Sequence, residues 1–93
     1  MIETDAPFGR VKKGDAGYAL LTSDEPIEVA KEKYSKGSIV KGRNEPCFVT
    51  EVNEILAAVL GKDEHEIARI CFENSLRFFN ITEWIFQYYT WQA

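Results

Sequence analysis

The apolar residues of the second half of the chain recur at the spacing of one face of an α-helix. They occupy relative positions 0, 1, 4, 7, 8, 11 and 12, at Phe48, Val49, Val52, Ile55, Leu56, Val59 and Leu60. Pro46 suits a first helical turn, and Gly61 is a natural stop after the last one. The pattern predicts a helix over 46–60, with Glu51 and Glu54 on the side away from the apolar stripe.

A second amphipathic stripe follows after a short break. Asp63 and Glu66 form a helix start signal, in which a side-chain oxygen caps the first N–H groups. The residues that then share one face are Ile67, Ile70, Cys71, Asn74 and Phe78. This predicts a helix over 64–79 that ends at Asn80, and Thr82 could cap a shorter helix over 83–91. We expect the two long helices to pack antiparallel and to leave an apolar patch open for self-association.

The end of the chain is rich in aromatic residues. Eight of the twelve lie between residues 72 and 91, and the last five are Trp84, Phe86, Tyr88, Tyr89 and Trp91. Such a cluster can be a protein-binding surface, a platform for stacked bases, or part of a packed core. Acidic surroundings disfavour the nucleic-acid interpretation, so packing is the favoured one.

The first half has no comparable period. Residues 1–5 have the pattern of a short strand that ends before Pro7. From there to Arg43 the chain is irregular, apart from a weak helical possibility over 26–34. So long a connection is uncommon in a compact domain, and a single strand cannot form a sheet. The pattern therefore predicts that strands to pair with it lie outside this chain.

Composition excludes several classes of protein. The chain is 45% hydrophobic and 28% charged, and no apolar run is long enough to cross a membrane. Its two cysteines are too few for a disulfide framework, which favours reduced thiols and a location in the cytosol or nucleus. Residues 1–45 hold 8 basic and 8 acidic side chains, whereas 46–93 hold 3 and 7. An acidic chain is not a bulk nucleic-acid binder, so contacts with a polyanion would come from Arg10, Lys12, Lys13 and the 31–43 stretch, or through a metal.

Glu3 and Asp5 are candidate functional residues at the end of the predicted strand. Being two residues apart, they share one face of it. Asp5 is a hard oxygen ligand suited to a divalent cation, or a carboxylate that takes a proton from water. The alternative is a pair of ordinary surface acids.

The second candidate segment precedes the first long helix. Asn44 or Glu45 could cap that helix, and Arg43 could clamp a phosphate with its planar guanidinium. By chemistry alone, capping is favoured. His65 is the only histidine and is predicted to be a solvated surface residue.

Taken together, these segments resemble the last portion of TatD-like deoxyribonucleases, in the eukaryotic branch of that family. The similarity lies in Met-Ile-Glu-Thr-Asp-Ala-Pro at 1–7, Arg-Asn-Glu-Pro-Cys at 43–47, and Glu-Asn-Ser at 73–75 followed by Phe-Phe at 78–79. The resemblance implies an α/β fold, the C-terminal part of a (β/α)₈ barrel hydrolase that cleaves DNA phosphodiester bonds with a divalent metal, Mg²⁺ or Zn²⁺. This chain would supply the last strand, a long loop and two to three helices, and by itself would be mostly α.

The resemblance also implies roles for individual residues. Asp5 resembles the aspartate after the final strand, which faces the metal centre and helps to activate the attacking water. The 43–46 segment resembles the loop before the family's last main helix, where Arg43 stays a candidate substrate contact by its guanidinium chemistry. The residues that complete the structural motif are Glu3, Asn44, Glu45 and Pro46.

The family's H-x-H pair, its glutamate and its two further histidines have no counterpart in this chain. We therefore expect a C-terminal fragment, with barrel residues 1–80 and an aromatic helix over 81–93. Alone it would be inactive and hold no metal, and its partners would be DNA in the complete enzyme, the rest of the barrel, or further copies of itself. The alternative is a non-catalytic helical module that binds a protein through residues 84–91.

Overall fold

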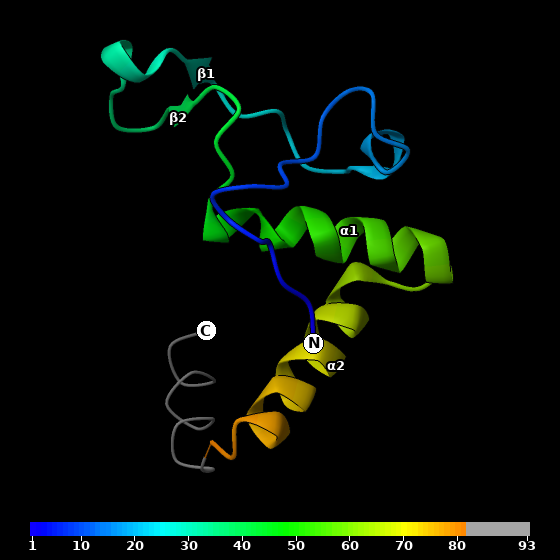
Figure 1. Cartoon of the computed structure of the whole chain (residues 1–93). Coiled ribbons are helices and arrows are strands. Elements are labelled where there is room, and N and C mark those ends of the chain that lie inside the picture. The colour runs from blue at the N-terminus through cyan, green and yellow to red at the C-terminus, as the bar shows by residue number, and fades with distance from the viewer. Residues whose placement is uncertain (82–93) are drawn as a thin grey trace.

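The computed structural model describes residues 1–81, and two α-helices dominate them. Helix α1 spans Val49–Leu60 and helix α2 spans Glu64–Phe78, joined by residues 61–63. Most of the N-terminal half lies over one side of α1, and its first residues cross α1 to reach the side from which α2 leads away (Figure 1). The third helix expected over 83–91 lies outside the described residues.

The ends of α1 follow the sequence signals closely. A 3₁₀ turn over Pro46–Phe48 leads directly into the α-helix, so the chain is helical across the predicted range 46–60. Gly61 has φ 64°, the left-handed conformation in which glycine escapes the usual steric penalty. The N–H groups of Gly61 and Lys62 turn back to bond the carbonyls of Ala58 and Ala57. The predicted glycine stop is confirmed.

Helix α2 also begins and ends where the sequence predicts. Asp63 Oδ1 accepts hydrogen bonds from the N–H groups of His65 and Glu66, at 2.8 and 3.3 Å. The helix ends at Phe78, and Asn80 lies beyond it at φ 53°. The axis of α2 runs obliquely away from α1 (Figure 1), so the expected antiparallel pair is wrong. The two helices still pack against each other, while Glu51 and Glu54 of α1 contact the N-terminal half.

The N-terminal half is built from turns and one very small sheet. Strands β1, Glu28–Val29, and β2, Ile39–Val40, pair in parallel. Short 3₁₀ turns occupy Tyr18–Leu20 and Lys31–Lys33. No α-helix forms over 26–34, because residues 28–29 pair with β2 and only Lys31–Lys33 make a single 3₁₀ turn.

The predicted strand over residues 1–5 is unpaired within residues 1–81, and its pairing with strands from outside this chain stays a prediction. The segment keeps the alternating exposure of an extended chain, but among residues 1–81 no backbone pairs with it as a strand. Its carbonyl at Thr4 is bonded by the side chain of Asn44 instead.

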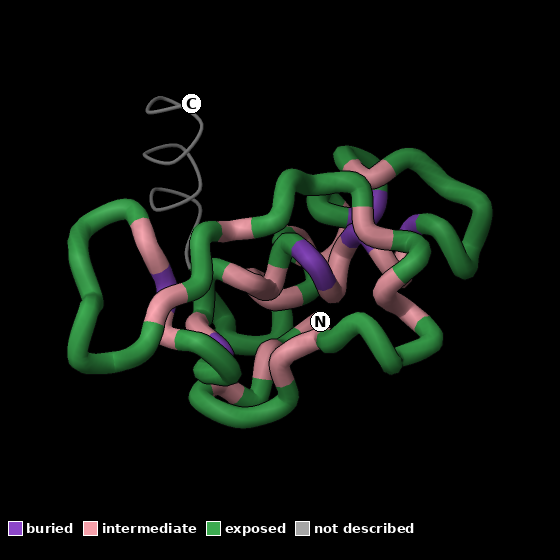
Figure 2. The backbone as a smooth tube through the Cα atoms, turned by 90° about the horizontal axis from the view of Figure 1, so that it is seen from above, coloured by how far each residue is buried: buried purple, intermediate pink, exposed green. Residues whose placement is uncertain are grey.

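The core of the described residues is small and unusually polar. Its buried apolar residues are Ile39, Ala57 and Ile67, and its buried polar ones are Asn44, Glu51 and Glu54 (Figure 2). The prediction that Glu51 and Glu54 lie on the exposed side of α1 is therefore wrong. Glu51 and Glu54 face the N-terminal half, which supplies partners for both carboxylates. Val59, on the apolar stripe, is 69% exposed.

One close approach fixes the N-terminal half against α1. A Cβ atom on Gly17 would lie 2.7 Å from Cδ1 of Ile55, so a larger residue at position 17 would require the end of that side chain to shift. None of the helices within residues 1–81 has the length and apolar character to cross a bilayer.

Candidate active site

Asp5 stands at the tip of a tight turn that follows the extended segment. Its φ is 57°, in the left-handed region that few residues other than glycine adopt and that aspartate tolerates better than most. Its carbonyl accepts a hydrogen bond from the N–H of Phe8 at 2.9 Å, and the Ala6–Pro7 peptide bond is cis. The Asp5 side chain is exposed, and among residues 1–81 its carboxylate has no hydrogen bond or ion pair. The turn thus presents a free carboxylate to solvent.

Asn44 joins the second candidate motif to this turn. Its side-chain Nδ2 donates to the carbonyls of Thr4 and Phe8, both at 2.7 Å, and its backbone N–H donates to the carbonyl of Pro7 at 3.1 Å. The residue is only 5% exposed. The structure therefore brings together two segments that lie 40 residues apart in the sequence.

Capping chemistry predicts that Asn44 or Glu45 caps the helix, but neither side chain does so. Asn44 Oδ1 accepts from the N–H of Glu45 at 3.0 Å, outside the helix. Neither Glu45 nor Phe48, which flank the 3₁₀ turn and α1, makes a side-chain cap. The amide of Asn44 is already committed to residues 4–8, so the prediction is wrong.

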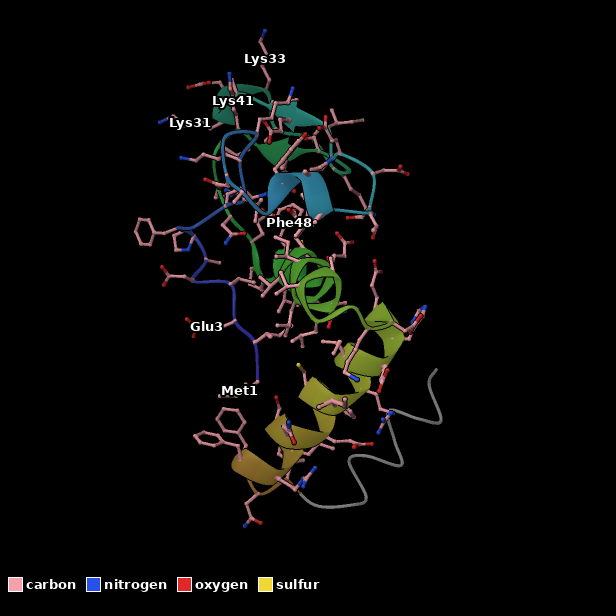
Figure 3. All side chains as sticks on the ribbon, turned by 90° about the vertical axis from the view of Figure 1, so that its right-hand side faces the viewer. Met1, Glu3, Lys31, Lys33, Lys41 and Phe48 are labelled. Atoms are coloured by element: carbon pink, nitrogen blue, oxygen red, sulfur yellow. The ribbon has the colours of Figure 1, made fainter. Side chains whose placement is uncertain are left out.

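The other predicted motif residues lie around this junction without entering it. Arg43 Nη2 pairs with Glu45 Oε1 at 2.7 Å, and the two side chains are 44% and 30% exposed. Glu3 is exposed and points away from the body of the protein (Figure 3). Pro46 begins the 3₁₀ turn. The phosphate-clamp role of Arg43 stays a prediction.

A buried ion pair that the sequence did not reveal lies next to this junction. Arg10 Nη2 is 3.1 Å from Glu51 Oε1, and the side chains are 9% and 7% exposed. The Arg10 guanidinium also lies 3.7 Å from the centre of the Phe48 ring. Arg10 is therefore used inside the fold and is not free for the polyanion contact proposed from its sequence position.

Burial sets the electrostatics of this pair. Desolvation raises the pKa of Glu51 above its ordinary value, Arg10 works against that rise, and the charge of Glu54 adds to it. Within the described residues, Glu51 Oε2 and two nitrogens of Arg10 have no hydrogen-bond partner. No local signal marks this pair, because its members come from a loop and a helix 41 positions apart.

A pocket of about 700 Å³ opens beside Arg10, but Asp5 is not among its lining residues. Its charged lining is Arg10, Lys12, Lys13, Lys41, Asp24, Glu25, Glu28 and Glu51. Lys41 lies at the same end of the molecule as Lys31 and Lys33 (Figure 3). Equal numbers of basic and acidic groups give this pocket no preference for one sign of charge.

The described residues do not by themselves form a metal centre. Within residues 1–81 no three His, Cys, Asp or Glu side chains come together as a set of ligands. His65 is exposed in the first turn of α2, as predicted, and Cys47 and Cys71 are free thiols. Asp5 alone offers one accessible oxygen donor, fewer than a hydrolytic metal requires. The aromatic cluster over 84–91 lies outside the described residues.

Comparison with known proteins gives a consistent result. A family model described as TatD related DNase matches residues 1–80. The chain is 36% identical over 77 residues to the deoxyribonuclease Tat-D of Schizosaccharomyces pombe, covering 82% of this chain and 25% of that protein. It is 28% identical over 76 residues to the putative deoxyribonuclease TATDN1 homolog of Encephalitozoon cuniculi, covering 82% of this chain and 24% of that protein. The chain thus spans about a quarter of the length of these relatives, and the match includes both segments that meet at Asn44.

Proposed function

Because the chain belongs to the family of TatD related DNases, we propose that it supplies the Asp5 carboxylate to the active site of a divalent-metal-dependent deoxyribonuclease. The substrate would be DNA, and the reaction would be hydrolysis of its phosphodiester bonds. One observation carries the proposal for this chain. Asp5 is exposed on a left-handed turn, and among residues 1–81 nothing neutralises or bonds its carboxylate.

A carboxylate placed in this way can do useful work in hydrolysis. Phosphodiester cleavage by water requires that the attacking water lose a proton, and a carboxylate within hydrogen-bond reach can accept it. Asp5 Oδ atoms face solvent, so a water molecule and a DNA phosphate have access to them. The turn carries the carboxylate on a backbone fixed at both flanks by Asn44.

The proposed metal, Mg²⁺ or Zn²⁺, needs more ligands than this chain's described residues offer. In the proposed enzyme those ligands come from outside residues 1–81. We likewise infer that the whole protein folds as a (β/α)₈ barrel with α1 and α2 on its exterior. The exposed apolar side chains of Val59 and Leu60, at 69% and 53%, are consistent with surfaces that neighbouring elements would cover. The location in the cytosol or nucleus stays a prediction.

Metal-dependent cleavage tests the proposal. The protein expressed from its complete reading frame should cleave a labelled oligonucleotide when Mg²⁺, Mn²⁺ or Zn²⁺ is added. Cleavage should be lost in EDTA and restored when the metal is returned. The isolated 93-residue chain should show no metal-stimulated cleavage, since it brings one accessible site carboxylate.

Three results would contradict the proposal in different ways. Absence of cleavage with every metal would contradict the nuclease function. Cleavage that is unchanged in EDTA would contradict the metal dependence. Strong metal-dependent cleavage by the 93-residue chain alone would show that its own residues complete a site.

A further inference from the structure

We propose that Asn44 is the positioning residue for the Asp5 carboxylate. The inference rests on the proposed function, because it concerns where that carboxylate is held for the reaction. Asn44 touches neither substrate nor metal in this scheme, and acts only through the backbone that carries Asp5.

The hydrogen bonds of Asn44 enclose Asp5 on both sides. Thr4, whose carbonyl receives one bond, directly precedes Asp5, whereas Pro7 and Phe8, whose carbonyls receive the other two, follow it. The turn closes on itself through the bond from Phe8 N–H to the Asp5 carbonyl. A left-handed aspartate is sparsely populated in a free chain, so its surroundings must hold it. Here the long-range contacts come from one residue, with two bonds from the Asn44 side chain and one from its backbone N–H.

Asparagine suits this position for a specific reason. Its amide has two N–H donors, and both are used on backbone carbonyls at 2.7 Å. Its oxygen accepts from the N–H of Glu45, which sets the orientation of the amide. An aspartate of the same size has no donor when ionised, and would set negative oxygens against two carbonyl oxygens. Substitution of Asn44 by Asp should therefore release the turn.

The rest of the fold does not depend on these bonds. The N-terminal half is fixed to α1 separately, by the Arg10–Glu51 pair and by the bond from Thr22 N–H to Glu54. Helix α2 is joined to α1 by the bond from Asn53 Nδ2 to the carbonyl of Glu64. Loss of the Asn44 contacts should thus loosen residues 4–8 and leave the helices in place, which distinguishes positioning from general stability.

Hydrogen exchange followed by mass spectrometry on the 93-residue chain tests this first step. Asn44→Asp should speed exchange of amides in residues 4–10 by about tenfold or more, with residues 49–78 unchanged. Asn74→Asp is the matched control, since it makes the same chemical change at an exposed site on α2 and should alter neither segment. Unchanged exchange at 4–10, or loss of helical circular dichroism in Asn44→Asp, would overturn the proposal.

A double-mutant cycle tests the second step in the protein expressed from its complete reading frame. Asn44→Asp should lower kcat at least tenfold with little change in KM, and should cause no further loss in an Asp5→Asn background. Asn44→Gln keeps the donors but displaces them, so its loss should be smaller. Equal losses in both backgrounds would show that Asn44 does not act through Asp5, and would overturn this proposal alone. If Asp5→Asn by itself leaves kcat unchanged, the role of Asp5 in the proposed function fails together with this one.

Discussion

The region before residue 49 and the two helices after it are held together by different means. Residues 1–48 are held by a few polar contacts between positions far apart in the sequence, such as Asn44 with Thr4, and Arg10 with Glu51 of α1. In residues 49–78 each turn of helix supports the next, and the end signals at Gly61 and Asp63 are local. Because of this difference, we expect single substitutions to lower stability far more in residues 1–48 than in the helices. Loss of one surface contact changes the stability of a helix little, whereas loss of the one residue that holds a turn should release that turn.

Removal of Arg10 should give the largest change in stability. Arg10→Met leaves Glu51 buried without its partner, and breaking a buried pair in this way costs about 3–5 kcal/mol. Urea unfolding followed by circular dichroism measures the loss. Arg69→Met is the control in the helical region, because the Arg69 side chain is 60% exposed in its pair with Glu73 and such pairs contribute about 0.3–0.5 kcal/mol. Similar losses at the two sites would erase the contrast between the regions.

The pH dependence of stability should reveal the same buried carboxyl. Burial raises the pKa of Glu51 in the folded protein above the ordinary 4.5, so the native state holds its proton more tightly than the unfolded chain does. The free energy of unfolding should therefore fall as pH rises from about 4.5 through the raised pKa. Urea unfolding at several pH values, for the protein and for Glu51→Gln, isolates this slope. A slope that is the same in both would show that Glu51 does not titrate as a buried group.

A helix cap should give a smaller effect in the regular region. Asp63→Ala removes the acceptor for the N–H groups of His65 and Glu66, and loss of such a cap costs about 1 kcal/mol. Asp24→Ala, at an exposed loop position, should cost much less. The two variants can be compared by urea unfolding, and a larger loss in Asp24→Ala would contradict the assigned cap.

The sequence predicted the helices because their signals are local. The apolar spacing, the glycine stop and the aspartate cap each involve residues only a few positions apart. The helices and both end signals that they predict are confirmed. The site could be predicted only in part. The pattern indicates Asp5 as a candidate ligand or base. It cannot indicate the partner of Asn44, because the donors and acceptor of that side chain suit a helix end and a distant loop equally well.

The remaining errors share one cause, which is distance along the chain. The sequence around Glu51 predicts an exposed carboxylate because no neighbouring residue can neutralise it, and its partner Arg10 comes from another segment. The strands of the small sheet are two residues long, too short for any alternation to be recognised.

The most direct test of the account is the effect of Asp5→Asn on metal-dependent cleavage of DNA. In the protein expressed from its complete reading frame, kcat should fall by about 10²–10⁴-fold, the usual contribution of a positioned acid or base. The melting temperature should stay nearly unchanged, because among residues 1–81 the carboxylate bonds nothing. Glu3→Gln, two residues away and also exposed, should keep nearly full activity. Near-normal turnover in Asp5→Asn, or an equal loss in Glu3→Gln, would contradict the assignment of Asp5 as the site carboxylate.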